Sequence, residues 1–326
     1  MKRTSRNGLT LLMIVNSLIF GIGGCAVAKG QETTVQQLVD SHYVNDEGVI
    51  HAYPNDETSE YLSESIGLYM QYLLQVNDEQ GFGKQVEILT DHFLIEQDGQ
   101  YFVPWRLYEK ANVNALIDDV RIAAALKNAA KAFNEPDFLV LAEQILSSIR
   151  SRQHQGGIAV DYYDWSYGVA GKRLTLSYLI NELTVSADSF DMLEAEKEQT
   201  FFPEYYDFDG KRYVESGEVH MIDQLLIAIN RFDQGLPSPR FDSWLMAEWE
   251  EKSMLAGRFD RDTGAPTVDY ESLAVYYYLW QYFERIEQPR FAEEAAKQAE
   301  LVTDGEVPGE LHFFDFIHYQ MMMADQ

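Results

Sequence analysis

Residues 63–74, with the sequence SESIGLYMQYLL, decide the fold class of this chain. The apolar residues of this stretch recur at the period of an α-helix and form one face: Ile66, Tyr69, Met70, Leu73 and Leu74. The same period returns in most later segments, and no segment has the pattern of a central strand. The sequence therefore predicts an all-α protein.

The expected helices are joined by short connections and alternate in character. They cover approximately residues 66–77, 84–95, 114–133, 136–150, 175–186, 189–199, 222–232, 240–256, 273–286, 290–303 and 310–323. The helix at 273–286 is apolar nearly all round, which predicts burial, whereas other helices are amphipathic. A ring of buried helices wrapped by outer helices, an (α/α)6 barrel, explains this alternation. A helical solenoid is the structural alternative.

Small β-hairpin insertions are expected between the helices. Residues 96–105 contain the turn sequence Asp98-Gly99, and residues 201–217 contain Asp209-Gly210, both typical of tight hairpins. These two hairpins and an aromatic, irregular stretch at 156–171 argue against a regular solenoid.

The first residues have the pattern of an export signal. A basic start precedes an apolar run, Leu9 to Ile22, which is short for a membrane span. The run ends at Ile22-Gly23-Gly24-Cys25, which resembles the bacterial lipobox and implies lipidation of Cys25 after removal of residues 1–24. Residues 25–40 would then be a lipidated tether on the extracytoplasmic face of the cell membrane, and 41–326 the catalytic domain. An uncleaved anchor with an inert Cys25 is the alternative.

The charge of the chain excludes some classes of partner. The net charge is −28, and removal of residues 1–24, which hold three basic residues and no acidic ones, makes it −31. Such a surface argues against nucleic acid and against polyanionic polymers, and it favours neutral or amino sugars. Cys25 is the single cysteine, so no disulfide is expected.

Carboxylates stand at the starts of three apolar helices: Glu64, then Asp118 and Asp119, then Asp223. Acidic residues commonly cap helix starts, and this is the simpler interpretation of any one of them. In a barrel of this kind, however, the inner helices run parallel, so their first turns would meet at one cleft. Glycoside hydrolysis needs two such carboxyl groups, one protonated to donate to the leaving oxygen and one to activate water or attack the sugar.

Four short motifs resemble glycoside hydrolase family 8, the family of certain bacterial cellulases, chitosanases and xylanases. They are Ser63-Glu64 with Met70 six residues on, Trp105-Arg106, Asp118-Asp119-Val120-Arg121-Ile122-Ala123, and Met221-Ile222-Asp223. The residues after Glu64 and the adjacent aspartates depart from the family pattern. They suggest a divergent branch similar to the lipoproteins and secreted hydrolases that accompany exopolysaccharide synthases.

The resemblance implies an (α/α)6 barrel that needs no metal or cofactor and hydrolyses with inversion. It implies Glu64 as the general acid, because Glu60 has Ile66 rather than methionine at the matching distance. Asp223 would activate the water, while Asp118 and Asp119 would hold the sugar beside the scissile bond. Since subfamilies differ in their base, Asp161 and Asp164 are alternatives to Asp223.

Weaker candidates surround these carboxylates. Arg106 could bind sugar hydroxyls or neutralise a carboxylate, and Glu271 could face the cleft or cap its helix. His51, His154 and His220 lack the spacing of metal ligands. Several aromatic residues could stack against sugars or pack locally: Trp105, Tyr162, Tyr163, Trp165 and Tyr270.

The sequence therefore predicts a lipid-anchored, endo-acting glycoside hydrolase of a bacterial exopolysaccharide or a related neutral or amino-sugar polymer, working with a synthase complex. The alternatives are a non-catalytic glycan-binding lipoprotein on the same fold, and a polysaccharide lyase or sugar epimerase of toroid fold.

Overall fold

The structure is a computed structural model that describes residues 33–108, 111–180, 187–194, 199–303, 305 and 307–326. The folded unit runs from Thr34 to Gln326. Its first helix, α1 (Val35–His42), lies mostly within the segment that the sequence assigned to the tether. Cys25 and the predicted signal lie outside the described residues. No helix in the described part of the chain is both long and apolar enough to cross a bilayer.

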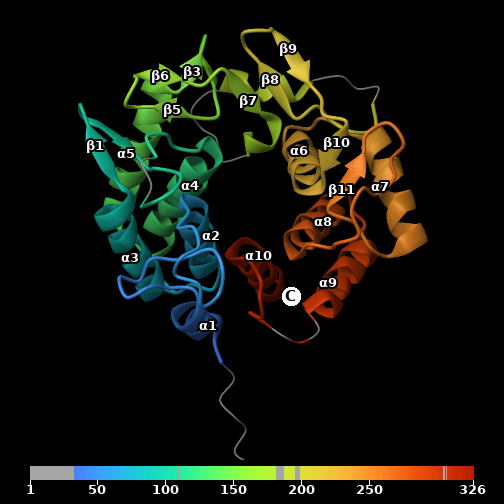
Figure 1. The fold of residues 1–326 in the computed structure, drawn as a ribbon, viewed down its shortest axis with the longest axis horizontal. Coiled ribbons are helices and arrows are strands. Elements are labelled where there is room, and N and C mark those ends of the chain that lie inside the picture. The colour runs from blue at the N-terminus through green and yellow to red at the C-terminus, as the bar shows by residue number, and fades with distance from the viewer. Residues whose placement is uncertain (1–32, 109–110, 181–186, 195–198, 304, 306) are drawn as a thin grey trace, which may run out of the picture. The chain divides into compact units, whose positions relative to one another are not determined.

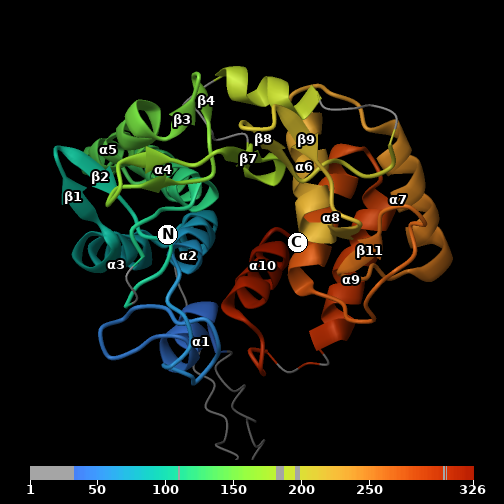
Figure 2. The same ribbon diagram turned by 45° about the horizontal axis from the view of Figure 1, so that its top comes forward.

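The centre of the fold is a closed ring of inner helices. These are α2 (Ser63–Gln75), α4 (Leu116–Ala132), α6 (Met221–Asp233), α8 (Leu273–Arg285) and α10 (Phe313–Ala324). Helix α2 packs on α4, α6 on α8, and α8 on α10. The last helix, α10, packs on α2, and Figures 1 and 2 show the two side by side. Between α4 and α6 the short 3-10 helix η2 (Leu176–Tyr178) packs on α6.

Outer helices cover this ring: α3 (Glu79–Ile88), α5 (Pro136–Arg152), α7 (Pro239–Lys252) and α9 (Pro289–Thr303). Helix α3 packs on α2, α5 on α4, and α9 on α8. Trp249 of α7 packs its indole against the rings of Tyr276 and Phe283 on α8. The prediction of an all-α (α/α)6 barrel is confirmed, and the contact between α10 and α2 excludes an open solenoid.

The division into inner and outer helices follows from the apolar pattern. The side chains of α8 are buried on most of its sides, as its aromatic sequence predicts. Helix α9 buries one stripe of Phe291 and alanines and exposes its charged face. At Gly67 the inner helices α2 and α4 approach so closely that a Cβ atom would lie 3.1 Å from Cγ1 of Ile122.

The two predicted hairpins are confirmed. Strands β1 (Ile95–Gln97) and β2 (Gln100–Phe102) pair around Asp98 and Gly99, which both have positive φ. Strands β7 (Arg173–Thr175), β8 (Tyr205–Asp207) and β9 (Arg212–Val214) form an antiparallel sheet. The other short strands pair as β3 with β4, β5 with β6 and β10 with β11: His154–Gln155, Ile158–Ala159, Tyr163–Asp164, Val169–Ala170, Glu218–His220 and Arg258–Asp260.

The structure differs from the sequence prediction in the third pair of helices. In place of helices at 175–186 and 189–199, the described residues form η2 and a second 3-10 helix, η3 (Ala187–Glu194). Residues 181–186 and 195–198 are outside the described part. The chain enters this region as strand β7, whose pairing with β8 sets its conformation as far as Thr175. Helix α3 also begins earlier than predicted, because Asp78 caps it by accepting from the amide of Gly81, and it continues into a π-helical turn, η1 (Leu89–Phe93).

We predict opposite effects of adding one methyl group at two helical glycines. Gly67→Ala should lower the free energy of unfolding by about 1–3 kcal/mol, because the new Cβ crowds Ile122. Gly83→Ala in α3 has no heavy atom within 4 Å of its new Cβ and should raise the free energy by about 0.5–1 kcal/mol. Urea unfolding of both variants checks this, and an equal change in the two would contradict the close packing of α2 on α4.

Candidate active site

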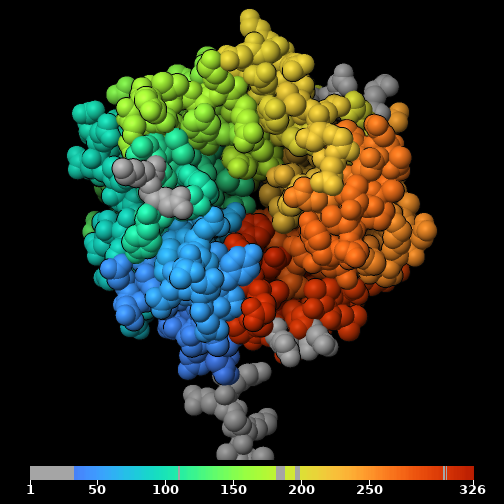
Figure 3. Space-filling view, viewed as in Figure 1, coloured from blue at the N-terminus to red at the C-terminus, as the bar shows by residue number. Residues whose placement is uncertain are grey.

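A pocket of about 490 Å³ opens where the inner helices begin. First-turn carboxylates from four of these helices line it: Glu64, Asp118, Asp223 and Asp315. The C-terminal halves of the same helices line a second cavity of about 380 Å³. The inner helices therefore run parallel, as predicted, and gather their N-termini at one mouth. Figure 3 shows a hollow near the centre of one face, bordered by blue, yellow and red segments.

The pocket carboxylates are not the N-caps of their helices. Leu62, Ala115 and His220 occupy the N-cap positions of α2, α4 and α6, and none makes a side-chain cap hydrogen bond. The exposed amides of these helix starts leave a partial positive charge at the mouth of the ring, which favours carboxylates there.

Three of the four carboxylates accept hydrogen bonds from serine hydroxyls of neighbouring elements. Ser63 Oγ donates to Asp118 Oδ2 at 2.7 Å, which joins α2 to α4. Ser177 Oγ of η2 donates to Asp223 Oδ1 at 2.8 Å. Ser272 Oγ at the start of α8 donates to Asp315 Oδ1 at 2.6 Å. These bonds fix the three carboxylates and leave acceptor capacity on each.

Glu64 is different, since its carboxyl group has no hydrogen-bond partner among the described residues. Its nearest ionic partner is Arg121, whose Nη1 lies 3.7 Å from Glu64 Oε1. Burial, with the neighbouring Asp118 and Asp315 carboxylates, raises the pKa of Glu64 to about 8, while Arg121 opposes the rise. At neutral pH Glu64 is therefore mostly a protonated acid able to donate its proton into the pocket.

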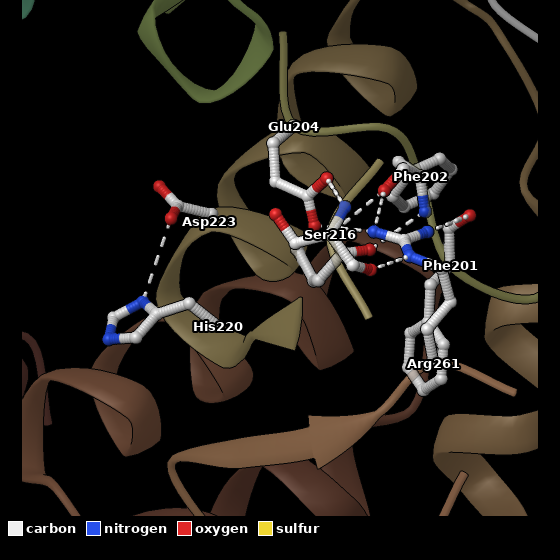
Figure 4. Close-up of polar contacts among 8 residues, drawn as sticks. Phe201, Phe202, Glu204, Ser216, His220, Asp223 and Arg261 are labelled. Carbon is white, nitrogen blue, oxygen red and sulfur yellow. Dashed lines mark hydrogen bonds and ion pairs between the residues drawn. The ribbon is translucent and has the colours of Figure 1, made fainter. Parts of the chain in front are cut away.

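Asp223 lies on the α6 side of the pocket with 37% of its side chain exposed. Its Oδ2 is 3.7 Å from Nδ1 of His220, as Figure 4 shows. Burial lowers the pKa of His220, and the Asp223 carboxylate opposes this. The Asp223 carboxylate is therefore partly accessible from the pocket, as a general base that accepts a proton from water must be.

The start of α6 is held by its neighbours. Strand β10 pairs with β11, and the amide of Met221 donates to the carbonyl of Gly257 at 3.0 Å. Figure 4 shows the Arg261 guanidinium, which follows β11, meeting the carboxylate of Glu204. It also donates to three backbone carbonyls in the loops before α6: Phe201, Phe202 and Ser216. This network ties the loops before Asp223 to β11.

Trp105 also lines the pocket, as predicted for a sugar-stacking residue, and 37% of it is exposed. Arg106 lies outside the lining. Its guanidinium stacks 4.8 Å from the centre of the Trp105 ring, and its Nη1 pairs with Glu60 at 2.7 Å. Arg106 therefore supports Trp105.

Two predicted acidic residues do not reach the pocket. Asp119 is 2% exposed and accepts from Asn114 Nδ2 at 2.6 Å, and burial raises its pKa. Asp118 occupies the position expected for the pair. Asp161 is buried and accepts from Arg173 Nε and from the amide and hydroxyl of Thr175, all within 2.7 Å. It holds a loop together.

The other predicted site residues also make their contacts outside the pocket. Asp164 accepts from the amides of the turn that follows it. Tyr163 and Trp165 stack on Phe102. Tyr162 packs over Gly171, and Tyr270 packs over Gly257. Both tyrosines are partly exposed and lie outside the pocket lining. Glu271 accepts from the side chains of Tyr276 and Gln298 and lies outside the pocket lining, and Ser272 rather than Glu271 caps helix α8.

Several pocket residues were not predicted from the sequence: Asp315, Tyr178, His312 and Phe314. Arg121 belongs to a predicted motif but was given no role there. Asp315 has the same first-turn position as the other carboxylates. It was missed because helix α10 begins at Phe313, three residues later than predicted. Arg121 follows Asp118 by three residues, so the two share a helix face.

The raised pKa of Glu64 predicts a pH-dependent effect of Glu64→Gln on stability. Between the ordinary value of 4.5 and about 8, the unfolded chain releases this proton and the folded protein keeps it, so wild-type stability falls as pH rises. Glutamine does not titrate. The gain in unfolding free energy for Glu64→Gln should therefore grow from near zero at pH 4 to about 1–3 kcal/mol at pH 9. Thermal and urea unfolding across this range measure it, and a constant difference would contradict the burial of a protonated Glu64.

The chain as a whole has relatives among known proteins. No protein-family model matches the chain. The chain is 32% identical over 256 residues to the putative lipoprotein YdaJ of Bacillus subtilis (strain 168), covering 74% of this chain and 69% of YdaJ. The crystal structure of PssZ from Listeria monocytogenes matches with 33% identity and a TM-score of 0.82, covering 90% of this chain and 94% of PssZ.

More distant structures share the fold. A novel alpha-amylase from Clostridium perfringens has 18% identity and a TM-score of 0.78, covering 89% of this chain and 96% of its own. Endoglucanase Cel10 from Klebsiella pneumoniae, a family 8 glycosyl hydrolase, has 12% identity and a TM-score of 0.60, covering 87% and 96%. At these identities the likeness shows the barrel alone, so the chain has the fold of family 8.

Proposed function

We propose that this chain, which belongs to the family of the putative lipoprotein YdaJ and of PssZ, is a glycoside hydrolase that cuts within a polysaccharide outside the cytoplasm. The observation that carries the proposal is the placement of Glu64 and Asp223 on different inner helices but in one pocket. Glu64 is an acid with 28% of its side chain exposed and no hydrogen-bond partner among the described residues. Asp223 is a carboxylate with 37% of its side chain exposed that accepts from the Ser177 hydroxyl.

In the proposed reaction Glu64 gives its proton to the glycosidic oxygen as the bond to the anomeric carbon breaks. Asp223 accepts a proton from a water molecule whose oxygen attacks that carbon from the opposite side. The configuration therefore inverts. Asp118, fixed by Ser63, would accept hydroxyl hydrogen bonds from the sugar and stabilise the positive charge that develops on its ring. This assigns to Asp118 alone the role that was predicted for Asp118 and Asp119 together.

The pocket lining supports a neutral or amino-sugar substrate. Beside the protonated Glu64 it holds three aspartates, Asp118, Asp223 and Asp315, against the one guanidinium of Arg121, so a polymer of acidic sugars would be repelled. Trp105, Tyr178 and Phe314 provide aromatic surface for a sugar ring. The departures from the family 8 pattern around Glu64 and Asp118 resemble a branch that accompanies exopolysaccharide synthases, so we propose an exopolysaccharide as the polymer.

The lipid anchor is part of the proposal. YdaJ is described as a putative lipoprotein, and the present chain has its one cysteine, Cys25, after a basic and apolar leader. A diacylglycerol group on Cys25 would hold the barrel on the extracytoplasmic face of the membrane, where two acyl chains suffice for stable attachment.

Removal of either proposed catalytic group should stop hydrolysis with the fold intact. Glu64→Gln and Asp223→Asn should each lower kcat by roughly 10²–10⁴-fold. Glu60→Gln, on the exposed carboxylate four residues earlier, should stay within about threefold of wild type. The assay scores new reducing ends from a panel of α- and β-linked glycans. Near-normal activity of Glu64→Gln would exclude it as the acid.

The same panel separates the other candidate functions. A glycan-binding lipoprotein would retain a polymer without forming reducing ends, and Glu64→Gln would bind it as tightly as wild type. A lyase would release products with an unsaturated sugar that absorbs ultraviolet light. An epimerase would act on free sugars and leave the polymer length unchanged.

Cys25→Ser should release the protein from the membrane. Without the thiol no thioether can form, so we expect the variant to lose metabolic labelling by a fatty acid. Fractionation of cells that express wild type and variant measures this. Equal labelling and equal membrane content in both would contradict lipidation at Cys25.

A further inference from the structure

Arg121 presents a buried donor that the fold does not use. The residue is 4% exposed, and its Nη1 has no hydrogen-bond partner among the described residues. Unpaired N–H groups of a buried guanidinium are costly, so a protein that retains one requires an explanation. Arg121 lines both the active-site pocket and the cavity at the opposite end of the ring. It separates the two.

A chain of buried hydrogen bonds fixes the other side of this guanidinium. Arg121 Nη2 donates to Tyr278 Oη at 3.1 Å. Tyr278 Oη lies 2.8 Å from His318 Nε2, and His318 Nδ1 lies 2.6 Å from the carbonyl oxygen of Phe314. Since that carbonyl can only accept, Nδ1 carries the proton of a neutral imidazole and Nε2 accepts from the tyrosine hydroxyl.

The hydrogen bonds of this chain can be assigned donors and acceptors in only one consistent way. Burial lowers the pKa of His318 to about 3, so the ring is neutral. The Tyr278 hydroxyl therefore donates to His318 and turns its lone pairs to Arg121. Helices α8 and α10 thus hold the guanidinium from behind, and its free Nη1 lies toward Glu64, at 3.7 Å from Oε1.

The separation suits a contact that forms only during the reaction. At 3.7 Å the two atoms are too far apart for a hydrogen bond, and a protonated Glu64 gains little from one. After Glu64 transfers its proton to the glycosidic oxygen, the carboxylate carries a full negative charge. A movement of less than 1 Å would bring it to the 2.7–2.9 Å of a charge-assisted bond.

We propose that Arg121 is a positioning residue which keeps an unused N–H for the Glu64 carboxylate formed on proton transfer, and that Tyr278 and His318 hold it in place. The catalytic role of Arg121 rests on the proposed function. Its effect on the pKa of Glu64 does not, and this effect is measurable without a substrate.

The other groups around Glu64 cannot replace Arg121. Asp118 and Asp315 are anionic and oppose ionisation of Glu64. The remaining titratable groups of the pocket lining are Tyr178, His220, Asp223 and His312. Among the described residues that line the pocket, Arg121 is the one permanently charged cation. Its removal should therefore leave the Glu64 carboxylate without a counter-charge.

The test is a carbon-13 NMR titration of the glutamate carboxyl groups in the full folded chain, with the Glu64 signal identified by its absence from Glu64→Gln. Arg121→Gln should raise the pKa of Glu64 by about 1–3 pH units, because the neighbouring cation is lost. Arg121→Lys keeps the charge and should stay within about half a unit of wild type. Arg285→Gln is the matched control, since Arg285 lines the opposite cavity and pairs with Asp233.

Tyr278→Phe tests the hydrogen bonds that hold Arg121, and it removes only one hydroxyl group. It should lower kcat on the cleaved glycan by about 10-fold or more with little change in KM, because Arg121 loses its acceptor while the substrate pocket is unaltered. The alkaline limb of the pH profile should move to higher pH in Arg121→Gln and stay in place in Arg285→Gln.

The outcomes distinguish this inference from the proposed function. A Glu64 titration that is unchanged in Arg121→Gln, or that moves equally in Arg285→Gln, overturns the role of Arg121 whether or not hydrolysis occurs. A Glu64 shift in a protein that cleaves no glycan supports the pairing and refutes the hydrolase. Should Arg121→Gln fail to fold, Tyr278→Phe decides, and a wild-type kcat in that variant overturns the inference.

Discussion

The parallel direction of the inner helices is the constraint on which the site depends. Because each inner helix is followed by a return segment or an outer helix, the inner helices all begin at the same mouth. Carboxylates in their first turns meet there although they are far apart in the sequence, and the positive helix ends reduce the cost of gathering them. The pocket is thus a consequence of the barrel.

Within this pocket the fold gives similar groups different chemistry. Asp118, Asp223 and Asp315 each accept a serine hydroxyl from a neighbouring element, which binds the ring together at its mouth. Glu64 accepts none among the described residues and has burial and two anionic neighbours instead. In the proposed mechanism that contrast distinguishes the acid, Glu64, from the base, Asp223, although both are carboxyl groups. In the proposed mechanism the Arg121 guanidinium, whose Nη1 has no hydrogen-bond partner among the described residues, supplies the counter-charge for Glu64 after proton transfer.

The sequence predicted the barrel and three of the four pocket carboxylates for a physical reason, and it failed where long-range contacts decide. An all-round apolar helix such as α8 must be buried, so its place in the ring can be read from the sequence. Asp118 and Asp119 differ by about 100° around α4, and only packing shows which one faces the axis. The 175–186 region was misjudged because strand β7 pairs with β8, about thirty residues later. Asp315 was missed through an error of three residues in the start of α10.

The most direct measurement of the central claim, that Glu64 is the proton donor, uses a substrate that needs no proton. This substrate is an oligosaccharide of the cleaved polymer with 2,4-dinitrophenol as its leaving group. The dinitrophenolate departs as a stable anion and needs no proton. The account predicts that Glu64→Gln cleaves this compound at close to the wild-type rate while it fails on the natural polymer. An equal loss of activity on both substrates would contradict it, because Glu64 would then act through binding or structure.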